Sequence, residues 1–511
     1  MKKIKFLSCE YNMYFAGVQN LKFLSFVNYF LRLHFEKRSI NSNLYEWLKP
    51  EILLLGPEPG EGPTKEFLNN LCNQLIEENV NILGVSVYVW NRTTFNIICK
   101  EIKSKLPNII IIGGGPELDA HKDLDFFKKH PWYDYVVYGD GEKSFTNLLD
   151  YLSGNEINLI NVVTKEKIYP HEIFNDKEML SQSPYITYKN EIKEVVEKYK
   201  NDYFTKFKRK QKLVLVWETT KGCPYKCSFC DWSSGLHNKV RFWGKIEKNT
   251  NTEIIKPNYQ QELDFFTELK VHMIMWSNPN VGLSPMDEEI VDYWCNLKKT
   301  NPATPISFVV QLSKIKKDVS HRLFKKMISS GLENRLKFDL QDLDPVVLNN
   351  IDRPEIPWEE HKAMIKEMCE EFPVQLGNFT SKINFIWGLP GQTLNHFDFN
   401  LTESTNLGFR TNFFYFEMLP NSPANNAEYI EKFKIKTEKI YVSHIQVPEF
   451  ITKITQEVLD NYFTETNLIT SCYSLSRKEW FTGVVKNYIY NYYFFSAMDK
   501  KLDKFFNNFY I

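Results

Sequence analysis

Hydrophobic and polar residues alternate with the periods of strands and helices over the first ~150 residues of the chain. Short β-rich runs occupy Ile4–Leu7, Ile52–Leu55, Ile82–Val89, Ile109–Ile112 and Tyr135–Tyr138. Two stretches between these runs, Thr64–Glu78 and Thr94–Leu106, carry apolar residues at helical spacing. This alternation predicts an α/β fold that begins with a doubly wound parallel sheet covered by helices on both faces.

A second alternating series begins near residue 212. Its predicted strands are Lys212–Thr219, Val271–Trp276, Ile306–Leu312, Leu336–Gln341, Ser381–Trp387 and Asn412–Leu419. Predicted helices lie between these strands, at Glu288–Lys299, Ser320–Ser330 and Pro357–Glu371. About six βα units in ~220 residues are too few for an eight-stranded barrel, so the pattern predicts a partial, six-unit βα barrel.

The pattern divides the chain into four parts. We predict a Rossmann-like domain at 1–163, a linker at 164–211, the partial barrel at 212–435 and a small, mainly helical region at 436–511. The linker is Lys-rich and contains one helix. In the last part, Ser476 and Glu479 form a capping-box start to an aromatic-rich helix. We interpret this helix as a lid or substrate platform over the barrel mouth, with a packing helix as the alternative.

Composition and charge exclude several classes of protein. The 511 residues are 43% hydrophobic, and 63 Lys and Arg residues balance 63 Asp and Glu residues. The chain therefore folds around large cores and lacks the overall charge that favours nucleic acids or anionic membranes. No run of about 18 apolar residues predicts a spanning helix. Six of the nine cysteines are solitary, which is typical of a reducing compartment. We expect a cytoplasmic protein without a membrane or nucleic-acid partner.

Glycines cluster where two predicted strands of the first sheet end. The clusters are Gly113, Gly114 and Gly115, and Gly139 and Gly141 followed by Glu142. In open α/β sheets ligands bind at the carboxyl ends of the strands, where glycine lets the backbone approach a large ligand. Both clusters are therefore candidate ligand-binding turns, although glycine also simply ends strands.

The most specific motif is a loop in which three residues separate Cys223 from Cys227 and two separate Cys227 from Cys230. Three thiolates on one short loop can each bind a different iron of a cubane, which leaves the fourth iron open for a catalytic ligand. A structural zinc site takes four protein ligands, and the nearest candidate for the fourth is His237. Zinc, or three buried and unreactive thiols, remain the alternatives.

This loop resembles the signature of the radical S-adenosylmethionine (SAM) enzymes, with Phe229 in the aromatic position before the third cysteine. The resemblance implies a [4Fe–4S] cluster on Cys223, Cys227 and Cys230, with the methionyl amine and carboxylate of SAM on the fourth iron. It also implies a 5′-deoxyadenosyl radical, a contact of Phe229 near the adenine, and an external electron donor such as flavodoxin or ferredoxin. A partial barrel is the fold of that family.

The N-terminal half resembles the cobalamin-binding domain of one branch of this superfamily. The matching stretches of this half are Gly84–Val87, Ile112–Glu117 and Tyr135–Glu142. Further support for the family comes from three later stretches, Gln341–Pro345 with Arg353, Gly388–Thr393 and Leu419–Pro423. The resemblance implies that residues 1–163 bind cobalamin. After the first strand, Glu10–Tyr14 lacks the Asp-x-His-x-x-Gly motif. The cobalt is therefore expected to have no protein histidine as its lower ligand, which suits methyl transfer.

Further cofactor contacts are expected from residues at or near the ends of strands on the face where a βα barrel binds its ligands. For SAM these residues are Gln311, Ser313, Gln341, Arg353 and Gly388, and for the corrin they are Ser86 and Tyr88 with the glycines above. A polar residue at a strand end can equally cap the next helix. Asn278 stands where relatives often carry an aspartate, which leaves one polar contact to the cofactor or substrate in doubt.

Together these features predict a cobalamin-dependent radical SAM methyltransferase. It would move a methyl group from methylcobalamin to an unactivated carbon of a small-molecule or peptide substrate. One alternative uses the same cofactors for rearrangement, cyclisation or epimerisation. Another, from a different class, is a non-catalytic metal-binding scaffold.

Overall fold

The computed structural model describes two compact units. The described residues are 1–9, 12–15, 19–58, 61–237, 239–242, 258–313, 315–333, 335, 337–372, 381–442, 453–456, 458–459 and 463–507. Unit 1 comprises Met1–Pro224, Asp231–Glu333 and Tyr441–Glu465, and unit 2 comprises Tyr225–Cys230, Asn334–Ile440 and Thr466–Ile511. Glu10 and Tyr11, which follow the first predicted strand, lie outside the described residues. In the described part of the chain, no helix is both long and apolar enough to cross a bilayer.

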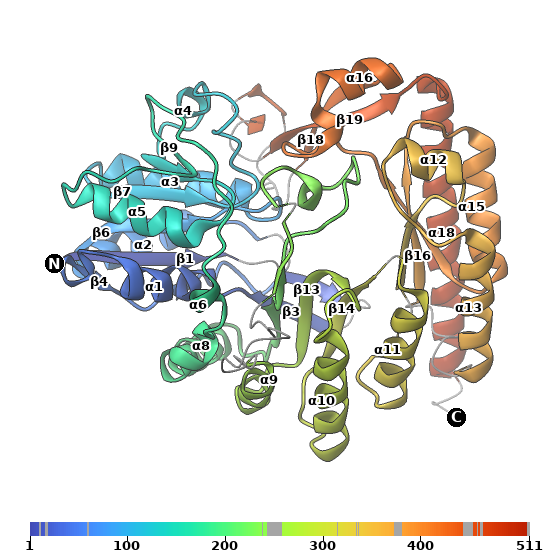
Figure 1. The fold of residues 1–511 in the computed structure, drawn as a ribbon, viewed down its shortest axis with the longest axis horizontal. Helices are drawn as coiled ribbons and strands as arrows, with labels where there is room; N and C mark the ends of the chain where they lie inside the picture. The colour runs from blue at the N-terminus through green and yellow to red at the C-terminus, as the bar shows by residue number, and fades with distance from the viewer. Residues whose placement is uncertain are drawn as a thin grey trace, which may run out of the picture. The chain divides into compact units, whose positions relative to one another are not determined.

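A mostly parallel sheet forms the first part of unit 1 (Figure 1). Its strands are β1 (Lys2–Ser8), β4 (Tyr45–Trp47), β5 (Glu51–Ile52), β6 (Val80–Ser86), β7 (Ile110–Gly114), β8 (Tyr135–Val137) and β9 (Val162–Val163). They lie in the order β4-β1-β6-β7-β8-β9, with β5 paired to β1. Strand β9 runs antiparallel to β8, and the other pairs are parallel. The parallel sheet expected from the sequence is present.

Helices cover both faces of this sheet because alternate residues of its strands serve two cores. Leu83 of β6 packs in one core with α2 (Lys65–Glu77) and α3 (Arg92–Lys105). Ile82 packs in the other core with α1 (Val27–Arg38) and α5 (Gly141–Leu152). The doubly wound arrangement predicted from the sequence is therefore confirmed, whereas α1 and α5 were not predicted.

The second sheet of unit 1 joins distant parts of the chain. Its strands are β2 (Asn12–Phe15), β3 (Gln19–Leu24), β10 (Lys212–Trp217), β13 (Met273–Val281) and β14 (Ile306–Leu312), in the order β14-β13-β10-β3-β2. Strands β10, β13 and β14 are predicted barrel strands. Helix α9 (Tyr259–Glu268) precedes β13, α10 (Asp287–Thr300) follows β13, and α11 (Lys317–Ser329) follows β14. The pairing of β3 with β10 was not predicted, and it extends the barrel sheet with a hairpin from near the N-terminus.

Residues 164–211 hold three helices, α6 (Lys177–Leu180), α7 (Pro184–Thr187) and α8 (Lys189–Phe207). Helix α8 contains the helix that the sequence predicts in the linker. Its Ile192 and Val196 are fully buried in the same core as Leu213 and Trp217 of β10. The helix is thus an integral part of unit 1, and its lysines lie on its outer face. The predicted domain boundaries stay a prediction.

Unit 2 holds the other three predicted barrel strands, β15 (Lys337–Gln341), β16 (Lys382–Trp387) and β17 (Arg410–Tyr415), which pair in parallel. Its helices are α12 (Pro345–Asn350), α13 (Trp358–Glu371), α15 (Leu394–Asn406), α16 (Ala427–Phe433) and α18 (Arg477–Asn507). Strands β18 (Lys436–Val442) and β19 (Thr464–Ser471) form a two-stranded sheet. All six predicted barrel strands are therefore present.

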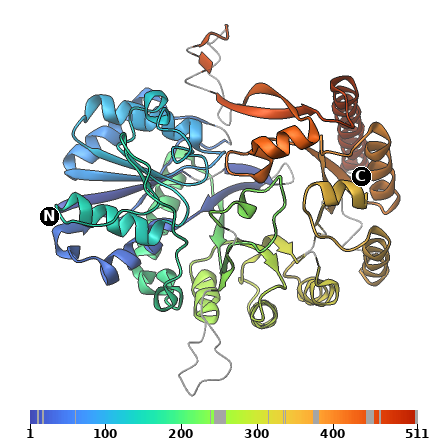
Figure 2. The ribbon, with the colours of Figure 1, turned by 45° about the horizontal axis from the view of Figure 1, so that its top comes forward.

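Helix α18 packs on the helix-covered face of the unit 2 sheet, beside α15 (Figures 1 and 2). The predicted capping box is present, since the Glu479 carboxylate accepts the Ser476 N–H at 2.9 Å and Ser476 Oγ accepts the Glu479 N–H at 3.3 Å. Trp387 Nε1 donates to the carbonyl of Trp480 at 2.9 Å, and Asn487 Nδ2 reaches the carbonyl of Phe413 at 3.4 Å. The lid or platform interpretation of this helix is therefore wrong, and the packing alternative is confirmed.

The packing of α18 depends on Gly483, where a Cβ would overlap the indole ring of Trp387. Alanine normally stabilises a helix relative to glycine by up to ~1 kcal/mol, but overpacking costs ~1–3 kcal/mol. Gly483→Ala should therefore lower the free energy of unfolding, measured by urea denaturation with circular dichroism. Thr482→Ala, one residue earlier on the same helix, is the control and should change stability little. A more stable Gly483→Ala variant would show that α18 does not pack this way.

Candidate cluster loop and cofactor sites

A two-stranded hairpin in unit 1 carries Cys223 at the start of its long connecting loop. Strand β11 (Thr220–Lys221) pairs antiparallel with β12 (Arg241–Phe242). Gly222 has φ +79°, and a Cβ there would lie 2.7 Å from the carbonyl oxygen of His237. The Cys223 N–H donates to the same carbonyl at 3.1 Å. The glycine before the first cysteine is therefore required by the close approach of the two arms of the hairpin.

Two asparagines of β13 hold the base of this hairpin. Asn278 is fully buried, and its Oδ1 accepts the N–H groups of Thr219 at 2.8 Å and Thr220 at 3.0 Å. Its Nδ2 donates to Thr219 Oγ1 at 2.7 Å. Asn280 Nδ2 lies 3.2 Å from Cys223 Sγ. The polar contact left in doubt at position 278 is therefore made to the protein backbone, and Asn280 is a neighbour of the first cysteine that the sequence did not reveal.

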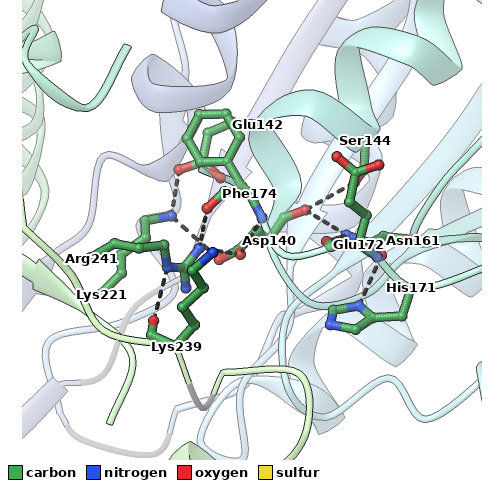
Figure 3. A network of polar contacts seen from close by, with 10 residues as sticks. All are labelled: Asp140, Glu142, Ser144, Asn161, His171, Glu172, Phe174, Lys221, Lys239 and Arg241. Carbon is green, nitrogen blue, oxygen red and sulfur yellow. Dashed lines mark hydrogen bonds and ion pairs between the residues drawn. The ribbon is translucent and has the colours of Figure 1, made fainter. Parts of the chain in front are cut away.

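An ion-pair network anchors the hairpin to the turn after β8 (Figure 3). Arg241 pairs with Asp140, and Arg241 Nη1 donates to the carbonyl of Phe174 at 2.6 Å. Lys221 pairs with Glu142 and lies 3.8 Å from Asp140. All four charged side chains are buried or nearly so. Glu142, predicted to contact the corrin, thus faces the lysine two residues before Cys223.

The network sets the charges around the loop. Burial alone would raise the pKa of the Asp140 carboxyl, but Lys221 and Arg241 outweigh it and hold that pKa below its usual range.

Glu218 lines a cavity of about 20 Å³ with Tyr185, Tyr259 and Glu262 among others. Burial raises the pKa of Glu218 to about 7, despite the opposing effect of Lys221. Glu218 is therefore partly protonated near neutral pH.

In unit 2, Ser228 clamps the middle of the cysteine loop. Its N–H donates to the carbonyl of Ile351 at 2.9 Å, its carbonyl accepts the Ala424 N–H at 2.9 Å, and its hydroxyl lies 2.9 Å from that of Tyr429. Ser228 is completely buried. Because it directly follows Cys227, these contacts fix the direction in which the loop presents that thiol. No sequence motif singled out Ser228 or Tyr429.

The three cysteines supply a soft donor set suited to an iron–sulfur cluster. Cys223 and Cys227 are buried, and Cys230 is partly exposed. Within the described ranges, no three side chains among His, Cys, Asp and Glu gather closely enough to share a single metal ion. In a cubane each thiolate binds a different iron, so its ligands need not converge in that way.

Phe229, Arg353 and Gln341 come together in unit 2. The guanidinium of Arg353 lies 5.8 Å from the centre of the Phe229 ring, within cation–π range. Arg353 and Gln341 both donate to the carbonyl of Asp339, Gln341 at 3.1 Å, and Arg353 also pairs with Glu355 at 2.8 Å. Gln341 has φ +68°, a conformation that is costly for a residue other than glycine. The backbone at the carboxyl end of β15 is therefore strained beside the cysteine loop.

Gly388 opens a turn organised by Gln392. Gln392 is fully buried, its Oε1 accepts the N–H groups of Gly388 at 2.9 Å and Leu389 at 2.8 Å, and its Nε2 donates to Asp342 at 2.7 Å. Burial raises the pKa of Asp342, although the bond from Gln392 opposes this. Gly388 has φ +106°, which favours glycine. These bonds join the carboxyl ends of β15 and β16.

Ser313 and Gln311 lie at the carboxyl end of β14 in unit 1. The Ser313 N–H donates to the carbonyl of Val281 at 2.7 Å, which ties the end of β14 to that of β13. The hydroxyl oxygen of Ser313 is buried and has no hydrogen-bond partner among the residues that the structure describes. A buried, unpaired hydroxyl is costly and fits a ligand that supplies the missing bond.

The glycine cluster after β7 lies beside Ser86 and Tyr88. Ser86 pairs in register with Gly114, and the Val87 N–H donates to the Gly114 carbonyl at 2.7 Å. Gly115 has φ +104°, and its Cβ would overlap the backbone of Val87. Among the described residues, a Cβ at Gly114 would meet only the carbonyl of Val137, at 3.5 Å. Gly115 is therefore required by the fold, whereas Gly114 leaves space at the strand ends.

Comparison with known families gives a match to the Radical SAM superfamily over residues 217–400. These residues are therefore similar to a radical SAM domain. The matched stretch begins at the last residue of β10 and contains the three cysteines of the loop together with the turn at Gly388.

Two characterised relatives extend the similarity over most of the chain. The cobalamin-dependent radical SAM methyltransferase TokK of Streptomyces tokunonensis is 25% identical over 449 residues, which are 86% of this chain and 60% of TokK. The 2-(S-pantetheinyl)-carbapenam-3-carboxylate methyltransferase of Streptantibioticus cattleyicolor is 24% identical over 480 residues, 92% of this chain and 63% of that protein. The chain thus spans less than two thirds of the length of these relatives.

A solved structure supports the same fold. OxsB, a cobalamin-dependent S-adenosylmethionine radical enzyme with aqua-cobalamin and S-adenosylmethionine bound, is 14% identical and has a TM-score of 0.51, over 84% of this chain and 56% of OxsB. At this identity the match is evidence for the fold alone. The resemblance to the cobalamin-binding branch of the superfamily and the fold class, both predicted from the sequence, are confirmed.

The buried network makes a prediction about stability. Arg241→Met removes the direct ion-pair partner of Asp140 and leaves this buried carboxylate with only Lys221, at 3.8 Å, which costs up to ~3–5 kcal/mol. Lys143→Met, which breaks the exposed pair between Lys143 and Glu172, should cost less than ~1 kcal/mol. Urea unfolding followed by tryptophan fluorescence measures both. Equal losses in the two variants would contradict the anchoring role of the network.

The carboxyl of Glu218 makes a prediction about pH. Its pKa is raised from 4.5 to about 7 in the folded chain, so the folded chain binds a proton that the unfolded chain releases between these pH values. The contribution to stability is therefore present at low pH and is lost as pH rises towards 7. Glu218→Gln should reduce this fall in the free energy of unfolding. Glu288→Gln is the control, because the pKa of Glu288 is lowered to about 2 by Arg322 and Lys326, and the fall should persist.

Proposed function

We propose that this chain is a cobalamin-dependent radical SAM methyltransferase that moves a methyl group from methylcobalamin to an unactivated carbon of a small-molecule or peptide substrate. The observation that carries the proposal is the three-cysteine loop, held at Cys223 by a closed hairpin and at Cys227 by the clamped Ser228, within a radical SAM domain. The names of the two relatives describe the same kind of reaction.

The cluster and SAM have fitting residues in the chain. Cys223, Cys227 and Cys230 would hold the cluster. Gln311 and Ser313 at the end of β14 would bind SAM in unit 1, and the unpaired Ser313 hydroxyl is the observation that favours this. In unit 2, the residues proposed to bind SAM are Phe229, Arg353, Gln341 and Gly388.

The corrin has a fitting site at the carboxyl ends of the first sheet. The chain passes from β1 to β4 on one side of it and later, from β5 through α2, to β6 on its other side, and ligands of such sheets bind where the strand order reverses. Ser86, Tyr88 and the open Gly114 lie at this edge, and Tyr88 stacks on Trp90 with ring centres 4.7 Å apart. Ser86, Tyr88 and the backbone at Gly114 would hold the corrin at this turn.

When bound, these cofactors supply a 5′-deoxyadenosyl radical that removes a substrate hydrogen and a cobalt-bound methyl group that replaces it. The chain contributes orientation. Asn280 and the closed hairpin position the Cys223 thiol, and Ser228 positions the Cys227 thiol. Arg353 keeps the Phe229 ring in one orientation. A reducing, cytoplasmic location and an external electron donor such as flavodoxin or ferredoxin belong to this proposal.

The proposal predicts cofactor content first. After anaerobic reconstitution the chain should hold about four irons, and Cys227→Ala should lose them. Cys369→Ala, at a solitary cysteine of α13, is the control and should keep the iron. Retention of one zinc and no iron would contradict the proposal.

A second experiment tests the reaction. The reduced chain is incubated with host extract and SAM carrying a deuterated methyl group, and mass spectrometry then searches for products that gain the labelled methyl. 5′-Deoxyadenosine without methyl gain would indicate the rearrangement alternative.

The corrin site predicts different effects at neighbouring glycines. Gly114→Leu should lower retained hydroxocobalamin at least tenfold while the apo chain unfolds at the same temperature, because the added side chain enters space that no described atom fills. Gly114→Ala should fold normally and keep most of the corrinoid. Gly115→Ala should instead destabilise the apo chain itself. Full corrinoid retention by Gly114→Leu would place the corrin elsewhere.

A further inference from the structure

Helix α18 is apolar on the face that it turns to solvent. Its inner face packs on the unit 2 sheet through Trp480, Gly483 and Asn487. The opposite face carries five large side chains, here called the α18 stripe, that are 41–72% exposed: Phe481, Val485, Tyr488, Ile489 and Tyr492. A helix on the surface of a folded domain normally presents charged and polar residues there, and a helix that is apolar on both faces is normally buried.

The α18 stripe is large for a surface that stays in water. At ~200 Å² for each aromatic side chain, its three aromatic residues leave on the order of 400 Å² exposed. Contiguous apolar patches of this size mark interaction sites. Two copies of the stripe that face each other, with Val485 and Ile489 included, would bury on the order of 1,000 Å², which is the lower limit for a specific protein interface.

The spacing of the α18 stripe is that of a seam between paired helices. Phe481 and Tyr488 are seven residues apart, and so are Val485 and Tyr492, which form a second row four residues further along. A seven-residue apolar repeat keeps one side of a helix facing a second helix over several turns. The sequence of α18 continues the first row at Phe495. The occupant that fits the stripe is therefore another long helix with the same spacing.

Charges at the two ends of the second row select a second copy of the same helix. Lys478 precedes Tyr492 by two repeats, and Asp499 follows Tyr492 by one repeat. Lys478 is exposed and has no ion-pair partner among the residues that the structure describes. If two copies of α18 pack antiparallel about a twofold axis between Tyr488 and Ile489, position 478 of each copy lies opposite position 499 of the other. A parallel pair would instead place like charges together at both ends.

We propose that the α18 stripe is the interface of a homodimer, in which two copies of α18 pack antiparallel with Lys478 of each copy opposite Asp499 of the other. In this register Tyr492 of one copy faces Val485 of the other, so the apolar rows cover each other. Because the buried area is below the ~1,600 Å² of a standard interface, the dimer forms with a dissociation constant in the micromolar range. The proposal does not rest on the proposed function, since no residue of the stripe is assigned to a cofactor.

Sedimentation equilibrium of the full apo chain, with a reductant present to prevent disulfides between chains, measures the association. The mass should rise from that of one chain to that of two between about 1 and 100 µM. Tyr488→Lys brings two like charges together beside the twofold axis and should raise the dissociation constant at least tenfold. Phe204→Lys, at a half-exposed aromatic residue of α8 in unit 1, is the matched control and should leave the association unchanged.

A charge exchange tests the antiparallel arrangement. Lys478→Asp brings like charges together at both ends and should weaken the dimer severalfold at low salt, and the further change Asp499→Lys should restore it. Tyr488→Lys should leave the unfolding temperature of the dilute, monomeric chain unchanged, because the side chain of Tyr488 lies mostly in solvent.

Three results would overturn the proposal: a wild-type chain that stays monomeric at about 100 µM, an equal loss of association in Phe204→Lys, or no recovery in the double variant. The measurements use the chain without cluster or corrinoid, so failure here and failure of the proposed function are distinguishable.

Discussion

The first cysteine of the cluster loop depends on buried charge being paired. Asp140 and Glu142 follow β8, Lys221 and Arg241 belong to the hairpin, and each acid has a basic partner at ion-pair distance. Buried pairs of this kind add little net stability, because desolvation offsets their attraction, but breaking one is costly. The network therefore acts mainly by positioning the hairpin. It permits one arrangement of the hairpin relative to the first sheet of unit 1, and this arrangement fixes where Cys223 lies.

The sequence predicts the strands and many of the helices because their patterns are local. Helix α1 was not predicted from the sequence, for a physical reason. Tyr29 and Leu33 pack in one core while Leu31 and Phe35 pack in another, so the helix has no single apolar stripe. The pairing of β3 with β10 was not predicted, because nothing in the local sequence specifies a partner strand nearly 200 residues away. Candidate cluster ligands could be named where spacing defines them, as in the cysteine loop, and they remain a prediction.

Residues that act through distant partners could not be found in this way. Ser228 and Asn278 look like ordinary polar residues until their backbone partners are known. Glu142 was assigned to the corrin from its motif, and the structure places it against Lys221. The sequence did carry one signal. Asp140 and Glu142 lie in one glycine turn and Lys221 lies beside another, and their charges are complementary. Gly114 and Gly115 belong to one motif but have different roles. A side chain at Gly114 would have space, whereas Gly115 is required by its contact with the backbone of Val87. The motif alone does not distinguish the two.

The two charged clusters of this chain differ in what they do for stability. In unit 1, two acids and two bases are balanced, buried and bonded to each other and to a backbone carbonyl. In unit 2, Lys337, Lys382 and Arg410 are direct partners on neighbouring strands; Lys337 lies 3.3 Å from Asp339, and Arg410 donates to Asn491 of α18 at 3.4 Å. In a balanced buried cluster the attraction roughly offsets the cost of desolvation, whereas like charges opposite each other destabilise a sheet. The first cluster therefore fixes the arrangement of the hairpin at little net cost, and the amino ends of β15, β16 and β17 are a place where a neutral residue would be more stable than a cation.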